Sequence, residues 1–287
     1  TSWAVLGEIY GFLPIRKPSI KFRRISSTLD DKSYRNTLNY IPEKITFKVD
    51  TNLSRLLVDP LYGHKPTFGV RELLQNAIDA CMERKEIEFQ KGNLQYIPSI
   101  TISINEIDSL NSTFIIQDNG KGMSSYEIIN YFLNVGTSFR KSMDWKKKFV
   151  DDEGKVKITR NGKFGIGVLA SFLLGDEIQV STRSISSMEN CSFNASIDSE
   201  FINISTNNSD EQNGTIITIP ITNKKRDELL NHTMSWDNRA LKWTNWYIYK
   251  EPSIKYFVNG EELKIENNIN PKKYFEGFLS GASRISR

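Results

Sequence analysis

Residues 71–80, which read Arg71-Glu-Leu-Leu-Gln-Asn-Ala-Ile-Asp-Ala80, decide the fold class of this chain. They lie within the strongest helical pattern of the sequence, which spans residues 70–90. At about 100° per residue, Glu72, Asn76 and Asp79 fall within about 60° of one another on one side of that helix. The opposite side is apolar and is expected to enter the core.

The polar row has a structural and a functional interpretation. A row of polar side chains is usually a solvated surface. However, Asn76 is a poor helix former in mid-helix, so a surface helix gains nothing from it. Two carboxylates and an amide oxygen in one row also form a hard-oxygen array, which suits Mg²⁺ and a water.

A second motif is Asp118-Asn-Gly-Lys-Gly122, which follows a strand pattern over residues 112–117. Taken alone it is a turn, because Asn-Gly is the strongest short hairpin signal. A calcium loop is excluded, because acids at alternating positions are missing.

A third motif runs from Gly162 to Ser171, where Gly165, Gly167 and Ala170 fit the pattern G-x-G-x-x-A. It suggests a dinucleotide fold, but it lies deep in the chain after a loop and not in a first βαβ unit. Glycines before a helix let backbone N–H groups approach a phosphate, which the helix dipole favours. A Walker A sequence is absent, which excludes ordinary P-loop ATPases.

The order of the motifs is more specific than any one of them. E-x-x-x-N-x-x-D-A is followed by D-x-G-x-G, G-x-G-x-x-A and then Gly214-Thr215 before an alternating strand. This order resembles the GHKL ATPase superfamily, the Bergerat nucleotide fold of gyrase, heat-shock protein 90, histidine kinases and MutL. The closest likeness is to the N-terminal ATPase domain of the heat-shock protein 90 chaperones. It rests on the first and third motifs and on the strand pattern over residues 45–49.

The resemblance implies an α+β fold, a Bergerat-type two-layer sandwich. A mixed, mostly antiparallel sheet would carry helices on one face and a long ATP lid. Residues 45–265 would form the ATP-binding domain, and residues 1–44 an N-terminal extension or the tail of a preceding domain. Residues 266–287 would be a linker toward a downstream domain.

Periodicity and turn residues predict the elements of this fold. We expect helices at 53–58, 70–90, 126–133, 168–174, 226–231 and 238–249. We expect strands at 45–49, 99–105, 112–117, 177–183, 192–206 and 215–220, and a hairpin at 254–265 around Asn259-Gly260. Residues 134–163 read as a long loop with one helical turn.

The resemblance also implies a role for individual residues. Glu72 would be the general base that orients the attacking water, and Asn76 would coordinate Mg²⁺. Asp118 would accept a hydrogen bond from the adenine amino group. The remaining members of the nucleotide pocket would be Asp79, Ala80, Gly122, Met123, Asn134, Lys163, Gly165, Ile166, Gly167, Val168 and Thr215.

The resemblance implies a different part of the nucleotide pocket for each of these residues. Asp79 and Ala80 would line the pocket, and Gly122 and Met123 would form the floor under the base. Asn134 would be a lid hinge. Residues 165–168 would offer backbone N–H groups to the phosphates, and Thr215 would support the adenine through a water.

Two positions depart from the chaperone pattern. Glu83 stands where a basic residue near the pocket is expected, and Lys163 stands where the chaperones commonly have glutamine. Residues 137–163 contain nine Lys or Arg and four acidic residues, a net charge of +5. The segment is either a solvated loop or a lid that folds over a triphosphate.

Composition narrows the class of protein. The chain has 287 residues and a net charge of +4, with nearly balanced charges, which argues against general disorder. Its two cysteines cannot build a disulfide framework or a zinc site, so a cytoplasmic, reducing compartment is expected. No apolar stretch approaches the ~20 residues that span a bilayer, so no membrane partner is expected.

The function expected from these observations is Mg-dependent ATP hydrolysis, slow in this fragment, that drives lid closure in a chaperone-like protein. ATP or ADP, Mg²⁺ and an unknown client protein are the expected partners, in a protein that could form a homodimer. The alternatives are a MutL- or MORC-like ATPase acting on DNA, with nucleic acid as partner, and a nucleotide-sensing module with little turnover. A histidine kinase is disfavoured, because those kinases lack the Glu72 base.

Overall fold

The computed structural model describes most of the chain from residue 65 onward and short pieces before it. The described residues are 31–41, 48–49, 65–135, 137, 139, 142–151, 153–158, 167–187, 189–196, 201–207, 212–231, 233–236, 239–242, 247 and 250–263. Contacts divide the chain into two compact units, Thr1–Glu43 and Lys44–Arg287. The first contains the short helix α2 (Lys32–Arg35), where the Asp31 side chain caps the helix by accepting from the Ser33 N–H. The two domain boundaries expected from the sequence, at 44/45 and 265/266, remain predictions.

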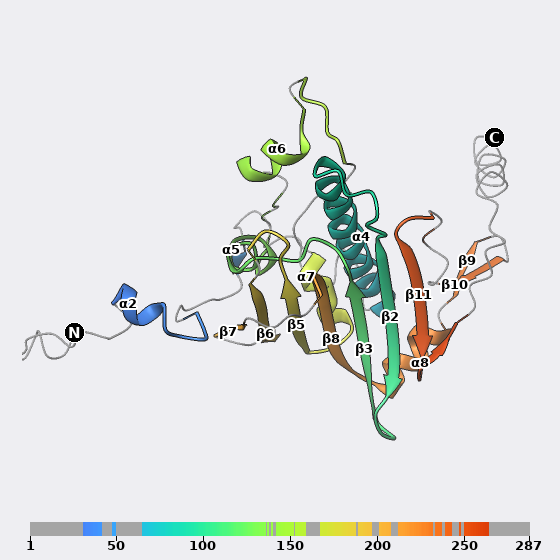
Figure 1. Ribbon diagram of the computed structural model, residues 1–287. Helices are drawn as coiled ribbons and strands as arrows, with labels where there is room; N and C mark the ends of the chain where they lie inside the picture. The colour runs from blue at the N-terminus through green and yellow to red at the C-terminus, as the bar shows by residue number, and fades with distance from the viewer. Residues whose placement is uncertain are drawn as a thin grey trace, which may run out of the picture. The chain divides into compact units, whose positions relative to one another are not determined.

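An eight-stranded sheet forms the centre of the second unit (Figure 1). Its order is β12-β11-β2-β3-β8-β5-β6-β7. The strands are β2 (Ser99–Glu106), β3 (Asn111–Asp118), β5 (Glu177–Arg183), β6 (Asn190–Ser196), β7 (Ile204–Asn207), β8 (Gly214–Thr222), β11 (Ser253–Val258) and β12 (Glu261–Glu262). Only β11 and β2 pair in parallel among these neighbours. The expected mixed, mostly antiparallel sheet of an α+β fold is confirmed.

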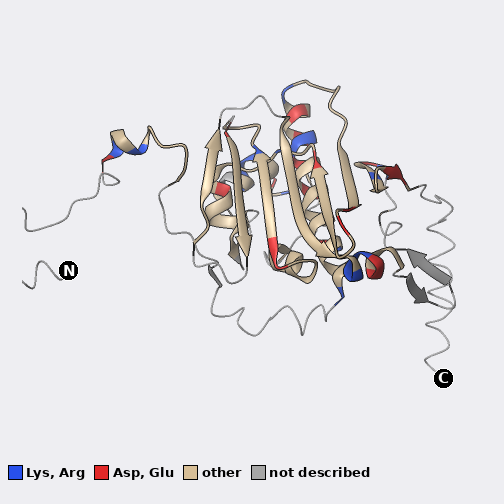
Figure 2. Cartoon of the chain, turned by 90° about the horizontal axis from the view of Figure 1, so that it is seen from below, with Lys and Arg blue, Asp and Glu red and all other residues tan. Residues whose placement is uncertain are grey.

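The core lies between this sheet and helix α4 (Pro66–Gln90), which covers one face together with α7 (Gly167–Ala170) (Figure 1). Alternate residues of the strands are buried, such as Ile100, Ile102 and Ile104 of β2. The apolar side of α4 is buried, as its period predicts. Figure 2 shows strands that are largely free of charge, with acidic and basic residues prominent on the helices and at strand ends.

The segment after β3 is more ordered than the sequence suggests. The expected helix at 126–133 is α5 (Ser125–Glu127) followed by a π-helix, η2 (Ile128–Phe132). The expected loop at 134–163 contains β4 (Asn134–Val135), which pairs in parallel with β1 (Lys48–Val49), and a two-turn helix, α6 (Met143–Phe149). The Ser142 hydroxyl caps α6 by accepting from the Trp145 N–H.

The later elements confirm most expectations and correct two. The strand expected at 192–206 is two strands, β6 and β7, which pair with each other in an antiparallel manner. α7 continues as a 3₁₀ turn, η4 (Ser171–Leu173), and α8 (Asn223–Asn231) lies where a helix was expected. The Asn259-Gly260 hairpin is present, with positive φ at both residues. The helix expected at 238–249 is wrong at its start, because β10 (Arg239–Lys242) pairs with β9 (Thr233–Trp236) in an antiparallel hairpin. The expected elements at 45–47 and 53–58 lie outside the described residues.

Candidate functional site

Two strand ends bring the second and fourth motifs together. Asp118, the last residue of β3, is directly opposite Thr215 on β8. Both side chains are buried. On the next strand, β5, Thr182 is opposite Thr215, and the two hydroxyl oxygens are 3.0 Å apart. An acidic acceptor and two hydroxyls therefore share one end of the sheet.

The turn after Asp118 is held tightly against α4. The Gly120 N–H donates to Asp118 Oδ1 at 2.7 Å, and the Lys121 N–H donates to the Ala80 carbonyl at 3.1 Å. A methyl group at Gly120 would lie 2.7 Å from both the Cβ of Ala80 and Asp118 Oδ1, so only glycine fits here. Ala80 thus faces the Asp118 turn, and its place in a nucleotide pocket remains a prediction.

Burial makes Asp118 an unusual carboxyl. Loss of solvent raises its pKa from 3.8 to about 7, although the backbone N–H groups of Gly120 and Thr215 and the cations of Arg84 and Lys121 act in the opposite direction. A carboxyl buried at a strand end, with so few fixed donors, has acceptor capacity for a ligand.

The neighbouring pair Gly122 and Met123 closes against β5. Gly122 has a φ of 64° and approaches the Arg183 backbone so closely that any side chain would collide with it. The Met123 N–H donates to Thr182 Oγ1 at 2.9 Å, and that hydroxyl donates to the Gly214 carbonyl at 3.0 Å. Thr182 therefore joins the second and fourth motifs. Its place in a strand is the only feature of the sequence that pointed to it.

The first and third motifs meet where α4 packs on α7. A methyl group at Gly167 would lie 3.1 Å from Asn76 Nδ2, 3.7 Å from Asn76 Oδ1 and 3.5 Å from Glu72 Oε2. The other carboxylate oxygen of Glu72, Oε1, pairs with the Arg71 guanidinium at 3.0 Å. Side chains of the predicted base and the predicted metal ligand thus face the first residue of the helix that follows the glycine motif.

The structure describes some of the remaining predicted site residues and not others. Asp79 is buried and accepts from Gln75 Nε2 at 3.0 Å, and Val168 is buried in α7. Asn134 lies in β4, where its carbonyl accepts from Thr137. Lys163, Gly165 and Ile166 lie outside the described residues.

Glu83 has a role that the sequence did not indicate. It is buried, and Trp145 of α6 donates its indole N–H to Glu83 Oε1 at 2.8 Å. Lys121 lies 3.9 Å from Glu83 Oε2, forms an ion pair with Glu127 and faces the Phe139 ring at 4.6 Å. Through Lys121 and Trp145, Glu83 connects the Asp118 turn to the segment that contains α6.

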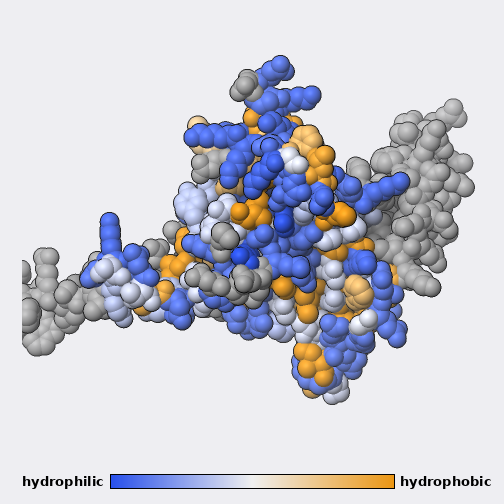
Figure 3. All heavy atoms as spheres, in the orientation of Figure 1, coloured by the Kyte–Doolittle hydropathy of each residue, from blue (hydrophilic) through white to orange (hydrophobic). Residues whose placement is uncertain are grey.

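A small apolar cluster reinforces this connection. Trp145, Phe149 and Ile158 are buried against one another, with Met82 and Ile87 of α4 packed on them. The lysines of α6 (Lys146, Lys147 and Lys148) are exposed, and Figure 3 shows a mainly hydrophilic surface at the top of the molecule with separate hydrophobic patches. The described part of this segment around α6 therefore packs on α4 with its apolar side and presents lysines on its outer side.

Comparison with known families identifies the class of protein. A sequence profile described as "Histidine kinase-, DNA gyrase B-, and HSP90-like ATPase" matches residues 64–229, more than half of the chain. The chain therefore belongs to this family, and its fold is that of an ATP-binding and ATP-hydrolysing domain.

Similar proteins come from the HSP90-like branch. The mitochondrial TNF receptor-associated protein 1 homolog of Dictyostelium discoideum is 32% identical over 146 residues, which are 50% of this chain and 20% of that protein. Chaperone protein HtpG of Rickettsia bellii is 29% identical over 196 residues, 66% of this chain and 30% of the relative. HtpG of Wolbachia pipientis is 29% identical over 199 residues, 68% of this chain and 30% of the relative. The matched part of the chain thus spans less than a third of these relatives.

Two features are absent from the described residues. These residues contain no helix long and apolar enough to cross a membrane. They also contain no group of three or more His, Cys, Asp or Glu side chains that could hold a metal ion by itself.

Proposed function

We propose that this chain is the ATP-driven switch of a chaperone-like protein, with adenine bound at Asp118 and the triphosphate at the α4–α7 contact. The observation that carries the proposal is that Glu72 and Asn76 of α4 face Gly167, the first residue of α7. The same sheet-and-helix unit also contains the buried Asp118, which can accept a hydrogen bond from a ligand. Helix α4 thereby carries the phosphate end, and its residue Ala80 packs against the turn that follows Asp118 at the base end.

At the base end, Asp118 selects adenine. The adenine amino group donates to the Asp118 carboxylate, whereas guanine presents a carbonyl oxygen at that position and would face another acceptor. Thr215 and Thr182 supply hydroxyls beside the carboxylate, and Gly122 and Met123 form the floor. Asp79 and Ala80 line the side formed by α4.

At the phosphate end, the residues fit a nucleotide-bound Mg²⁺. The Asn76 amide oxygen is a hard donor that faces Gly167, which suits an ion that takes its other ligands from phosphates and water. The absence of a side chain at Gly167 leaves a space next to Asn76 that a methyl group would fill. Asn76 would hold the ion, whose charge would neutralise the phosphates when bound. Lys163 and the N–H groups of residues 165–168 would hold the phosphates.

Glu72 performs the chemistry that the chain itself supplies. It orients a water toward the γ-phosphorus and accepts a proton from it as the new P–O bond forms. The bond between the γ-phosphorus and the bridging oxygen breaks, and ADP and inorganic phosphate leave. The Arg71 guanidinium holds Oε1 of Glu72, so Oε2, which faces Gly167, is the oxygen placed to accept the proton.

At the level of the whole protein, we infer a chaperone cycle from the relatives named as chaperones. ATP would order the segment that contains α6 and with it the contacts to downstream domains, a client protein and a second copy of the chain. The expected compartment is the cytoplasm, although one relative is named as mitochondrial. Asn134 would act as the hinge of the moving segment.

The test is titration calorimetry with ATP, ADP and GTP, followed by single-turnover hydrolysis with Mg²⁺. We expect ATP and ADP to bind, GTP not to bind, and bound ATP to be hydrolysed at a rate that DNA does not change. Equal affinity for GTP would refute the role of Asp118. Tight ATP binding without hydrolysis would favour the nucleotide-sensing module, and a DNA-dependent rate would favour the MutL- or MORC-like alternative.

A further inference from the structure

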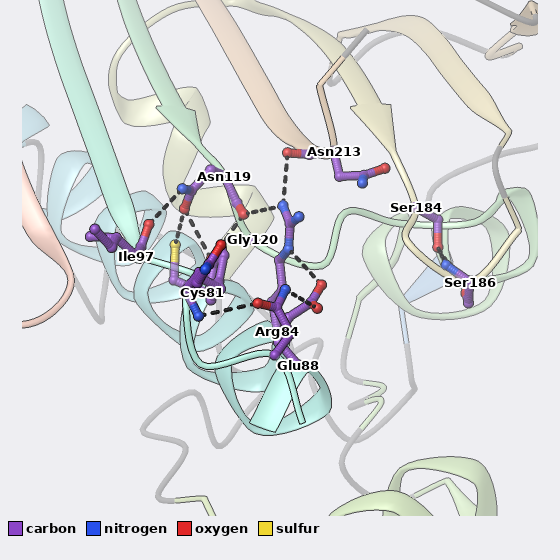
Figure 4. Close-up of polar contacts among 12 residues, drawn as sticks. Cys81, Arg84, Glu88, Ile97, Asn119, Gly120, Ser184, Ser186 and Asn213 are labelled. Atoms are coloured by element: carbon purple, nitrogen blue, oxygen red, sulfur yellow. Dashed lines mark hydrogen bonds and ion pairs between the residues drawn. The ribbon is translucent and has the colours of Figure 1, made fainter. Parts of the chain in front are cut away.

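Arg84 of α4 contacts two loop residues, Asn119 and Asn213, that lie next to the ends of β3 and β8 (Figure 4). It lies on α4, with its side chain 17% exposed. Its Nη1 donates to the Asn119 carbonyl at 2.8 Å and is 3.5 Å from the Asn213 carbonyl. Asn119 follows the end of β3, and Asn213 precedes the start of β8. One guanidinium therefore ties together the two strand ends that carry Asp118 and Thr215.

The guanidinium is itself held in place. Its central carbon lies 4.6 Å from the centre of the Tyr96 ring, and its Nε is 3.5 Å from Glu88 Oε1. The stacking on Tyr96 and the Glu88 carboxylate on the same helix limit the positions that the Arg84 guanidinium can adopt. An arginine fixed in this way supports the backbone that it contacts and is not a mobile surface charge.

Asn119 receives most of the remaining polar contacts of the turn. Its Oδ1 accepts from the Ser99 N–H at 2.9 Å, and its Nδ2 donates to the Ile97 carbonyl at 2.8 Å. The Tyr96 hydroxyl lies 2.9 Å from the Asn119 carbonyl, so that carbonyl is shared between Tyr96 and Arg84. The backbone that carries Asp118 is consequently anchored on one side by β2 and on the other by Arg84.

We propose that Arg84 is a positioning residue for adenine recognition, which holds the Asp118 turn and the start of β8 as one rigid edge of the base pocket. Arg84 does not touch the nucleotide in this arrangement. It acts through Asp118, so the inference rests on the proposed function. Fixing an acceptor before the ligand arrives lowers the entropy lost on binding.

The same geometry couples Arg84 to the charge of Asp118. The titratable groups that act on this carboxyl are Arg84 and Cys81 from α4, Lys121 from the turn and Tyr96 from the segment before β2. Burial raises the pKa of Asp118 to about 7, and the Arg84 charge acts to lower it. Cys81 and Tyr96, whose own pKa values burial raises, stay neutral there at pH 7.

The experiment compares ATP and ADP affinity across pH 5–9 for the wild type, R84Q, R84K and K85Q. Lys85 is the matched control, because it is the next cation on α4 and pairs with the exposed Glu251. For R84Q we expect affinity for both nucleotides to fall by about tenfold, with an unchanged ATP-to-ADP ratio. In a plot of affinity against pH, the loss of affinity on the acid side should begin at a higher pH in R84Q than in the wild type, and we call the pH of half-maximal loss the midpoint. R84K should keep the wild-type midpoint and lose about threefold in affinity. K85Q should match the wild type.

Each outcome decides between defined alternatives. Wild-type affinity and midpoint in R84Q would overturn the inference, and so would a loss of affinity without a shift of the midpoint, which a merely structural role would produce. If R84Q fails to fold, R84K decides, and unaltered affinity in R84K is then the contradicting result. A wild type that binds no ATP, or D118N with wild-type affinity, would refute the proposed function instead.

Discussion

Gly167→Ala should separate folding from catalysis in this protein. The added methyl group would lie 3.1 Å from Asn76 Nδ2 and 3.5 Å from Glu72 Oε2. Because ordinary contacts are about 3.5–4.0 Å, the amide must retreat by about 0.4 Å or more. The amide is the end of a rotatable side chain, so the backbone need not move.

The two consequences differ in size. Alanine is a better helix former than glycine by up to about 1 kcal/mol, which offsets the crowding, so the free energy of unfolding should change by less than about 1 kcal/mol. The positions of Glu72 and Asn76 relative to the reacting atoms have no such tolerance, because a displacement of about 1 Å can lower the rate about 100-fold. We therefore expect single-turnover hydrolysis to fall about 10- to 100-fold, while ATP affinity falls less than about tenfold.

The assay is single-turnover hydrolysis beside thermal unfolding and ATP titration. Gly175→Ala is the matched control, because its methyl group would collide with the Pro220 carbonyl, away from Glu72 and Asn76. It should lose stability and keep the specific activity of its folded fraction. Wild-type turnover in Gly167→Ala would refute the placement of the catalytic pair against α7.

Two further predictions concern the Asp118 carboxyl and the docked α6 segment. The folded protein keeps a proton on Asp118 between pH 3.8 and about 7, where the unfolded chain has lost it, so the stability of the nucleotide-free protein should fall as pH rises through that window. Asp118→Asn should flatten the slope in a pH series of unfolding curves, and an unchanged slope would assign it to another group. Trp145→Phe removes the donor to buried Glu83 and should loosen residues 142–158 in hydrogen exchange, at a cost of about 1–3 kcal/mol locally. ATP analogues should protect that segment more than ADP does, and equal protection by both would leave it a solvated loop.

The sequence predicts the parts of this fold that have a period or a turn signal. Helix α4 and strand β5 follow from their apolar patterns, and Asn259-Gly260 follows from its turn chemistry. The strands β9 and β10 were missed, because a short hairpin is stabilised by pairing between segments and not by local preference. The order of the motifs identifies the family, since four of them recur at compatible spacing.

The residues of the candidate site also divide into those that the sequence predicts and those that only the structure reveals. Asn76 could be chosen because it is a poor helix former in mid-helix, and Glu72 and Asp118 could be chosen because they stand in an ordered series of motifs that resembles a known family. Thr182 and Arg84 could not, because a threonine in a strand and an arginine on a helix are ordinary. Their roles depend on cross-strand register and on which loops reach α4. Such contacts join residues between 32 and 129 positions apart, and no local pattern records them.

The assignment of Glu72 as the base, the central claim, is tested most directly by single-turnover hydrolysis in Glu72→Ala beside its ATP affinity. Glu72 lies one helical turn from Asn76 and at the opposite end of the site from Asp118, so the variant should bind ATP within a fewfold of the wild type. Its hydrolysis rate should fall by about 10²–10⁴. Loss of ATP binding, or hydrolysis at the wild-type rate, would contradict the assignment of Glu72 as the base and with it the proposed site.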